Sequence, residues 1–195
     1  MKNKDNGSMY CENKIYKQVD FSKNLLKYRE CENCKFLNCN FLNSDISGVK
    51  FIDCIFQNCN MSMVKLKNTV FNNVKFKGTK MFGLHFENCN DFILSISFYN
   101  CALNYSSFFG LKIKNTIFEN TCLNGVDFTG ADISKSVFRN CDFANAAFEK
   151  TNAEGSNFET SYGYVIDPEI NRVRKAKFDL QGVLGLLTKY DIEIK

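Results

Sequence analysis

The chain has 195 residues, of which 45% are hydrophobic, so it is long enough to form one domain with a buried core. Its formal net charge of +4 is too small to indicate nucleic-acid binding by itself, and no stretch is apolar enough to predict a membrane span. We expect residues 1–15 to form an N-terminal tail or cap. Because no apolar signal segment follows the first residues, we expect a cytoplasmic protein whose ten cysteines are reduced.

A repeat with a period of five follows this tail. Every fifth residue from Phe21 to Phe86 is apolar. The next step falls on Asp91, and the pattern resumes two residues later, from Ile93 to Phe158. A helix has a period of about 3.6 residues and a strand a period of about 2, so neither explains this pattern. We therefore predict one solenoid over residues 16–160, with a two-residue insertion between Phe86 and Ile93.

The residues around each apolar centre indicate the shape of one repeat. A small residue commonly lies two positions before the centre, and Asn or Gly, which tolerate turns, commonly lies two positions after it. When the centres are written in rows of four, one column contains only phenylalanine. This predicted core ladder consists of Phe36, Phe56, Phe76, Phe98, Phe118, Phe138 and Phe158. The columns predict a four-sided coil of about seven turns, roughly 34 Å long at ~4.8 Å per turn.

The motif small–polar–Phe/Leu–x–x resembles the pentapeptide-repeat protein family. It is seen in Cys34-Lys-Phe-Leu-Asn and Cys141-Asp-Phe-Ala-Asn, and the resemblance covers residues 16–160. It implies an all-β fold, a right-handed quadrilateral β-helix. It also implies a non-catalytic protein that binds other proteins. Qnr-type (quinolone-resistance) members of the family bind DNA gyrase or topoisomerase IV as DNA mimics and thereby protect these enzymes against quinolones.

Residues 161–195 are predicted to cap the last coil. Asp167-Pro168 indicates a turn within a hairpin-like segment, and Asp179 is a plausible N-cap of a short helix. Gly182 and Gly185 weaken this helix prediction. The apolar stripe expected on the helix consists of Leu180, Val183, Leu184, Leu186, Leu187 and Tyr190. Because the stripe is large for one coil end, and because the segment resembles the C-terminal module of Qnr-type proteins, we also expect it to form a homodimer contact.

Few residues indicate chemistry. Cys31 and Cys34 have the spacing of a redox or zinc motif, but in the coil both point inward, and no second ligand pair follows. We therefore interpret the cysteines as small core residues, with the outward-facing Cys122 as the most exposed thiol. His85 is the only histidine, so no Ser-His-Asp or Cys-His set can be assembled. We expect no catalytic residue, no metal, no cofactor and no small-molecule substrate.

The charges suggest two further surfaces. The first is a basic cluster, for which a solvated face is the simpler interpretation and direct nucleic-acid binding the less favoured one: Lys65, Lys67, Lys75, Lys77 and Lys80. The second is a candidate acidic face for binding a protein that normally binds DNA: Glu119, Asp127, Asp132, Asp142, Glu149, Glu154 and Glu159. The sequence leaves two functions open, a DNA mimic acting on gyrase or topoisomerase IV and an interaction scaffold with another protein partner.

Overall fold

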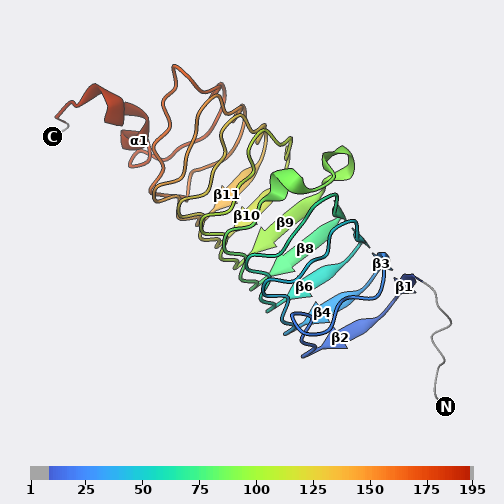
Figure 1. The fold of residues 1–195 in the computed structure, drawn as a ribbon. Helices are drawn as coiled ribbons and strands as arrows, with labels where there is room; N and C mark the ends of the chain where they lie inside the picture. The colour runs from blue at the N-terminus through green and yellow to red at the C-terminus, as the bar shows by residue number, and fades with distance from the viewer. Residues whose placement is uncertain (1–8, 194–195) are drawn as a thin grey trace, which may run out of the picture.

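The computed structural model describes residues 9–193, which form a four-sided rod of stacked coils with a small helical cap at one end (Figure 1). One side is a seven-stranded parallel sheet, in the order β11-β10-β9-β8-β6-β4-β2. Its strands in chain order are β2 (Ile15–Lys17), β4 (Lys35–Leu37), β6 (Ile55–Gln57), β8 (Val74–Lys77), β9 (Ile96–Tyr99), β10 (Ile117–Glu119) and β11 (Val137–Arg139). Six turns therefore separate its first strand from its last.

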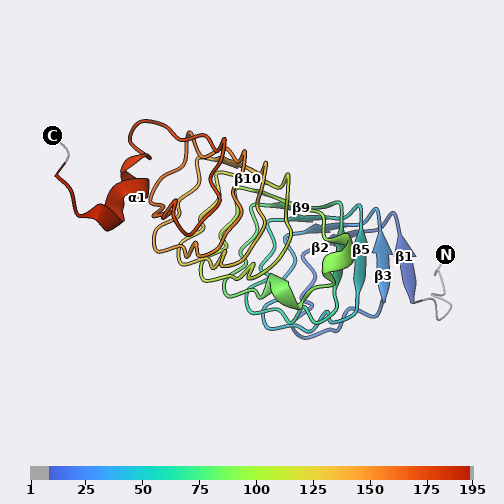
Figure 2. The same ribbon diagram turned by 90° about the horizontal axis from the view of Figure 1, so that it is seen from above.

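The preceding side of the coil carries a second parallel sheet at its N-terminal end, in the order β1-β3-β5-β7. It consists of β1 (Tyr10–Glu12), β3 (Glu30–Glu32), β5 (Lys50–Ile52) and β7 (Val70–Asn72), which lie side by side in Figure 2. The other two sides are joined by isolated parallel bridges, such as Asp20↔Asn40 and Asp45↔Lys65. We number the sides by their inward residues: side 1 contains Phe41, side 2 Ile46, side 3 Phe51 and side 4 Phe56.

The corners between sides explain the frequent Asn and Gly of the repeat. Most corner residues adopt a positive φ, for example Asn38 at 54° and Gly48 at 72°. This left-handed conformation costs other residues roughly 1–2 kcal/mol, and Asn and Gly reach it most readily. Six corners of the described coils nevertheless carry larger side chains: Gln18, Met63, Tyr105, Lys135, Lys150 and Lys175.

The phenylalanine column forms the centre of the core. All seven rings predicted from the sequence are fully buried. Consecutive rings stack face to face, with centroids 4.6 Å apart for Phe36 and Phe56 and 4.9 Å apart for Phe98 and Phe118. Rings of side 1 meet this column edge-on, as Phe41 does with Phe36 at 5.6 Å. Several Thr, Ser and Cys residues two positions before a centre donate to main-chain oxygens of the coil before, as Thr69 does to Ile46 at 2.9 Å.

The β-helix begins earlier than residue 16. Cys11 in β1 pairs with Cys31 in β3 and is buried, so the first coil includes part of the segment expected to be a tail. It also ends later than residue 160. Arg172 bridges to Asn152 in parallel, and the ring of Phe178 stacks on Phe158 at 5.3 Å. Residues 171–178 therefore continue the coil in parallel rather than forming the hairpin-like segment that we expected.

Two short 3-10 turns lie near the insertion. The first, η1 (Phe86–Asn88), stays in the coil and begins at the buried Phe86 of side 2, whereas the second, η2 (Asp91–Ile93), forms a bulge on side 3. The bulge projects from the rod in Figure 1. Asn90 still bonds to Thr69, and Ser95 to Phe71, so the residues between them leave the coil without breaking it. The inward position predicted for Ile93 is wrong, because Ile93 is half exposed and Leu94 packs against the core instead. On side 3 of this coil, the inward position is therefore one residue later than predicted.

Candidate functional site

The seven carboxylates of the predicted acidic face do not share a face. Glu119 and Glu159 lie on side 4, because they belong to β10 and to the coil position that follows β11. Asp127 lies on side 2, Asp132 on side 3 and Asp142 on side 1, each bridged to the same position one coil away. Glu149 and Glu154 follow on sides 2 and 3. The acids therefore ring the C-terminal half of the rod.

Three of the seven carboxylates are in ion pairs. Asp132 lies 3.0 Å from Lys114, Glu154 lies 2.8 Å from Arg172, and Glu119 lies 3.4 Å from Arg139. Within residues 9–193, no ion pair involves the other four, Asp127, Asp142, Glu149 and Glu159. These four are the carboxylates whose charge is least compensated.

The aspartates also have a role in the turns. Asp127 accepts the N–H of Thr129 at 2.8 Å, and Asp142 accepts that of Ala144 at 3.0 Å. Asn40 does the same for Leu42 on an earlier coil of side 1. Asparagine can therefore replace these aspartates with the turn bond intact, whereas a charge reversal to lysine removes the acceptor.

The lysine cluster is divided among three sides. Lys65 and Lys67 lie on side 2, Lys75 and Lys77 in β8 on side 4, and Lys80 on side 1. Such an arrangement offers no continuous track for a phosphate backbone. Lys65, Lys67 and His85 line a shallow groove on side 2 together with Met63 and Gly83.

The C-terminal cap is held to the rod by specific contacts. It contains α1 (Leu184–Leu187) and η3 (Thr188–Tyr190). The Asp179 carboxylate accepts the N–H of Gly182 at 2.7 Å, as expected of an N-cap, although the first turn is not regular α-helix. Lys189 pairs with Asp167 at 2.8 Å, and this contact holds the pKa of the Asp167 carboxyl below its ordinary value. The Tyr190 hydroxyl donates to Glu169 at 2.9 Å.

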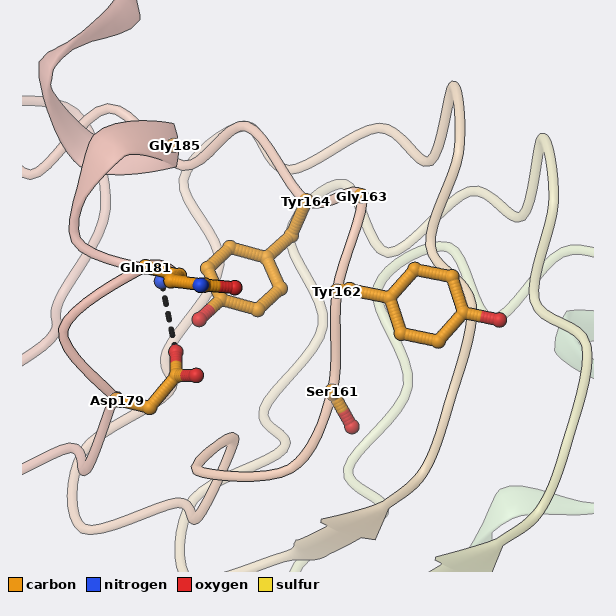
Figure 3. A pocket seen from close by; sticks show the side chains of 8 residues that line it. Ser161, Tyr162, Gly163, Tyr164, Asp179, Gln181 and Gly185 are labelled. Carbon is orange, nitrogen blue, oxygen red and sulfur yellow. Dashed lines mark hydrogen bonds between the residues drawn. The ribbon is translucent and has the colours of Figure 1, made fainter.

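A buried tyrosine closes the core beneath the cap. The Tyr164 ring packs against Phe143, Phe158 and Phe178, with centroids 5.6–6.1 Å apart. Gly182 and Gly185 lie directly against it, so a Cβ on either would overlap Tyr164. Figure 3 shows residues that line the small pocket between the last coil and the cap, among them Tyr162, Tyr164 and Asp179. Burial, with the charge of Asp179, raises the pKa of Tyr164 to about 12, so it remains protonated.

The cap presents an apolar surface to solvent. Leu180 is 88% exposed, and Val183, Leu184 and Tyr190 are also exposed. Leu187 is half-buried, and Leu186 packs against the core. Of the six residues of the predicted stripe, Leu186 therefore attaches the cap to the core, and the four exposed residues are available to a partner. Val165, Ile170 and Ile192 are further exposed apolar residues of the C-terminal segment, and the sequence pattern did not identify them.

No arrangement of the described residues indicates a reaction centre. His85 is exposed and lies 2.8 Å from Glu87. Among residues 9–193 no group of His, Cys, Asp and Glu is placed to hold a metal ion. The cysteines there are free thiols, and all except the half-buried Cys122 are buried. No helix within these residues is both long and apolar enough to cross a membrane.

Comparison with protein families decides which fold family this rod represents. A model of the "Pentapeptide repeat region" matches residues 29–90, and a model of "Pentapeptide repeats (8 copies)" matches residues 121–159. The chain belongs to the pentapeptide-repeat family. Its coils are the repeat scaffold of that family, and the interruption at the bulge lies between the two matched regions. A sequence search of curated proteins finds no match.

Solved pentapeptide-repeat structures share the fold. Two trypsin-treated variants of QnrB1, a plasmid-mediated fluoroquinolone resistance protein, match with a TM-score of 0.63 and 19% identity. These matches cover 95% and 96% of this chain and 100% and 98% of those chains. HetL is a pentapeptide-repeat protein from the cyanobacterium Nostoc that is involved in heterocyst differentiation regulation. It matches with a TM-score of 0.45 and 10% identity, over 86% of this chain and 84% of the HetL chain. The QnrB1 matches confirm the expected quadrilateral β-helix.

Proposed function

We propose that this chain is a non-catalytic rod that binds another protein and that it dimerises through its C-terminal cap. The observation that carries the proposal is the exposed apolar surface on the cap, formed by Leu180, Val183, Leu184 and Tyr190 at one end of the rod. A two-fold contact between two copies of this surface would remove it from water. Such a dimer is a rod of double length with the ring of carboxylates on both sides of its centre.

We further propose that the partner is DNA gyrase or topoisomerase IV, bound in place of DNA, as the resemblance to Qnr-type proteins implies. Two features support this proposal. Of the seven acids of the predicted acidic face, the four that make no ion pair within residues 9–193 lie in the half of the rod nearest the dimer contact: Asp127, Asp142, Glu149 and Glu159. The fold is shared with QnrB1, itself described as a fluoroquinolone resistance protein. A basic DNA channel attracts such carboxylates as it attracts phosphates.

A second candidate function is a scaffold for a different protein. Two observations favour it: the seven acids are spread over four sides, and three of these acids are in ion pairs. A mimic of DNA needs rows of charge in register instead. On this proposal the partner surface is not defined by the carboxylates.

The deciding experiment is DNA supercoiling by gyrase, measured across a titration of the protein with and without ciprofloxacin. The topoisomerase proposal predicts inhibition at high protein concentration or protection from the drug at low concentration. The variant Asp127→Asn/Asp142→Asn/Glu149→Gln/Glu159→Gln should lose the effect with its fold intact. The matched control is Asp20→Asn/Asp53→Asn, which removes charge from the other half of the rod and should keep the effect. A full titration without effect on gyrase or topoisomerase IV leaves the second candidate.

A further inference from the structure

Three thiols meet in the first coils of the rod. Cys11 in β1 and Cys31 in β3 are direct partners in neighbouring parallel strands, and both point into the core. Their Sγ atoms are 3.0 Å apart, and the Sγ of Cys34 lies 3.8 Å from that of Cys11. The sequence pattern paired Cys31 with Cys34 alone, because it assigned Cys11 to the tail.

The environment of Cys11 favours its thiolate. The Cys11 thiol donates a hydrogen bond to the Cys31 sulfur. The interaction with Cys31 holds the pKa of Cys11 below its ordinary value, with Tyr16, Cys34 and the charge of Lys14 acting in the same direction against the effect of burial. The same contact raises the pKa of Cys31. A thiolate is the nucleophilic form of cysteine, so Cys11 is the thiol of this group that reacts with an electrophile.

Other cysteines of the core have a different arrangement. Cys54 donates to the main-chain oxygen of Cys31 at 3.3 Å, Cys59 to that of Phe36 at 3.3 Å and Cys141 to that of Phe118 at 3.5 Å. Equivalent positions on other coils hold Thr69 or Ser136, which donate in the same way. These cysteines substitute for hydroxyl residues. Cys59 also interacts with the thiol of Cys39, whose pKa it lowers, but the group at Cys11 is the one in which three thiols meet.

The strand geometry also permits a covalent link. Adjacent strands are about 4.8 Å apart, within the range of roughly 4.4–6.8 Å found between the Cα atoms of a disulfide. Among residues 9–193, Cys11 belongs to the terminal strand of its sheet, β1, which pairs with β3. A solenoid coil with one neighbour opens more readily than an interior coil, and a small oxidant can enter there.

We propose that Cys11, Cys31 and Cys34 form an oxidisable thiol site that closes a disulfide between the first two coils. Hydrogen peroxide is the oxidant. The Cys11 thiolate attacks one peroxide oxygen, the O–O bond breaks, and hydroxide leaves, which gives a sulfenic acid on Cys11. The thiol of Cys31 or Cys34 then attacks that sulfur, the S–O bond breaks, and water leaves with the thiol proton. Two thiols are oxidised by two electrons in total, and one peroxide is reduced.

The disulfide would have a defined structural effect. It joins residues 20 positions apart, so it restricts the unfolded first coil to a closed loop. The end coil then opens less often, and cleavage by a protease within residues 12–30 should slow at least severalfold. Reduction by dithiothreitol should restore the original rate.

The experiment treats the folded full chain with hydrogen peroxide and maps its disulfides by mass spectrometry of unreduced peptides. The expected product is Cys11 linked to Cys31 or Cys34, with a loss of two hydrogens. Cys31→Ala should move the link to Cys34, and Cys11→Ala should abolish it. The column of Cys11 and Cys31 already accepts Ala153 in the core, so these variants should fold, and circular dichroism checks this.

The matched control is Cys54→Ser, which replaces a buried thiol by the hydroxyl found at equivalent positions and should keep the disulfide. Two results overturn the proposal. In the first, Cys11 stays reduced in folded protein under peroxide that fully oxidises the half-buried Cys122. In the second, Cys11→Ala and the unmodified chain form the same disulfides.

Discussion

Gly185 of α1 lies so close to the main-chain oxygen of Tyr164 that a Cβ at residue 185 would overlap it. The two glycines that weaken the helix are thus what allows the cap to approach the end of the core. The close approach also explains the hydrogen bond from the Ile166 N–H to the Gly185 oxygen at 3.1 Å. Local helix propensity and packing against the rod make opposite demands at this position.

This conflict predicts the sign of one substitution. In an isolated helix Gly→Ala stabilises by about 1 kcal/mol. We expect Gly185→Ala to destabilise the docked cap instead, by about 1–3 kcal/mol, since the added methyl group overpacks a filled site. Hydrogen exchange of residues 179–193 measures this change. Gln181→Ala, at an exposed position of the same cap, is the control and should have little effect. Unchanged protection in Gly185→Ala would contradict the packing argument.

A second prediction separates the turn role of an aspartate from its charge. Asp142→Ala removes the acceptor of the Ala144 N–H and should lower the free energy of unfolding by about 0.5–1.5 kcal/mol. Asp142→Asn keeps an oxygen in that place, as Asn40 and Asn60 do on side 1, and should be close to neutral. Urea unfolding of both variants tests the difference. Equal losses in the two would show that charge, and not the turn bond, stabilises this position.

Corner strain gives a third prediction. Lys135 has a φ of 59°, in the left-handed region that asparagine tolerates better. Lys135→Asn should raise the free energy of unfolding by about 0.5–1 kcal/mol. Lys112→Asn is the control, because Lys112 is exposed on side 3 and has no positive φ, so its replacement brings no such gain. The urea midpoints of the two variants are compared with that of the unmodified protein. If both midpoints rise, the removal of a positive charge, and not the relief of backbone strain, explains the stabilisation.

Much of this architecture could be predicted from sequence because a solenoid repeats one local rule. Fivefold spacing placed the phenylalanine column in the core, and the rows of four gave the number of sides. The rule fails where one repeat stands alone. Cys11 lacks neighbouring repeats that would reveal its inward position, although it pairs with Cys31 of the regular pattern.

The candidate surfaces were harder to predict. Proximity in sequence groups Asp127, Asp132 and Asp142, but five residues make one side, so these three aspartates point in three directions. Conversely, the thiols of Cys11 and Cys31 are 20 residues apart and touch. In a coil of this kind a shared face requires a spacing of 20, or 22 across the bulge, and the charges show no such spacing over the whole set.

The carboxyl of Asp45 yields a prediction about pH. Hydrogen bonds from the Ser47 side chain and N–H, with the nearby charge of Lys65, hold its pKa below the ordinary value of 3.8. The Asp45 carboxyl therefore binds a proton more tightly in the unfolded chain than in the folded chain. The ionised carboxylate contributes its full stabilisation of the fold when the pH is above the ordinary pKa of 3.8. This stabilisation is lost as the pH falls through the lower folded pKa. Asp45→Asn has no such titration, so the loss of stability between about pH 5 and pH 2 should be smaller in the variant than in the unmodified protein.

Urea midpoints measured over this range test the prediction, because the remaining carboxyls titrate equally in both proteins. If the urea midpoints of the unmodified protein and of Asp45→Asn fall in parallel as the pH is lowered, the loss of stability does not come from protonation of Asp45.

The cap surface leads to a prediction about oligomeric state. Leu180 is 88% exposed and Leu184 is 48% exposed, and both lie on the end of the rod rather than in its core. If two copies associate there, a charge at either position must be buried without a partner, which costs several kcal/mol. Leu180→Glu/Leu184→Glu should therefore convert the dimer to a monomer with an unchanged circular dichroism spectrum. Sedimentation equilibrium over a concentration series measures this change.

The control places the same charge at the opposite end of the rod. Leu25 is 72% exposed beyond the first coils, and Leu25→Glu should leave the dimer intact. A dimer that persists in the cap variant but dissociates with Leu25→Glu would move the contact to the N-terminal end, and the carboxylate ring would then lie at the two tips. The two rings would then lie apart, so this outcome would contradict the arrangement proposed for the dimer, in which both rings flank its centre.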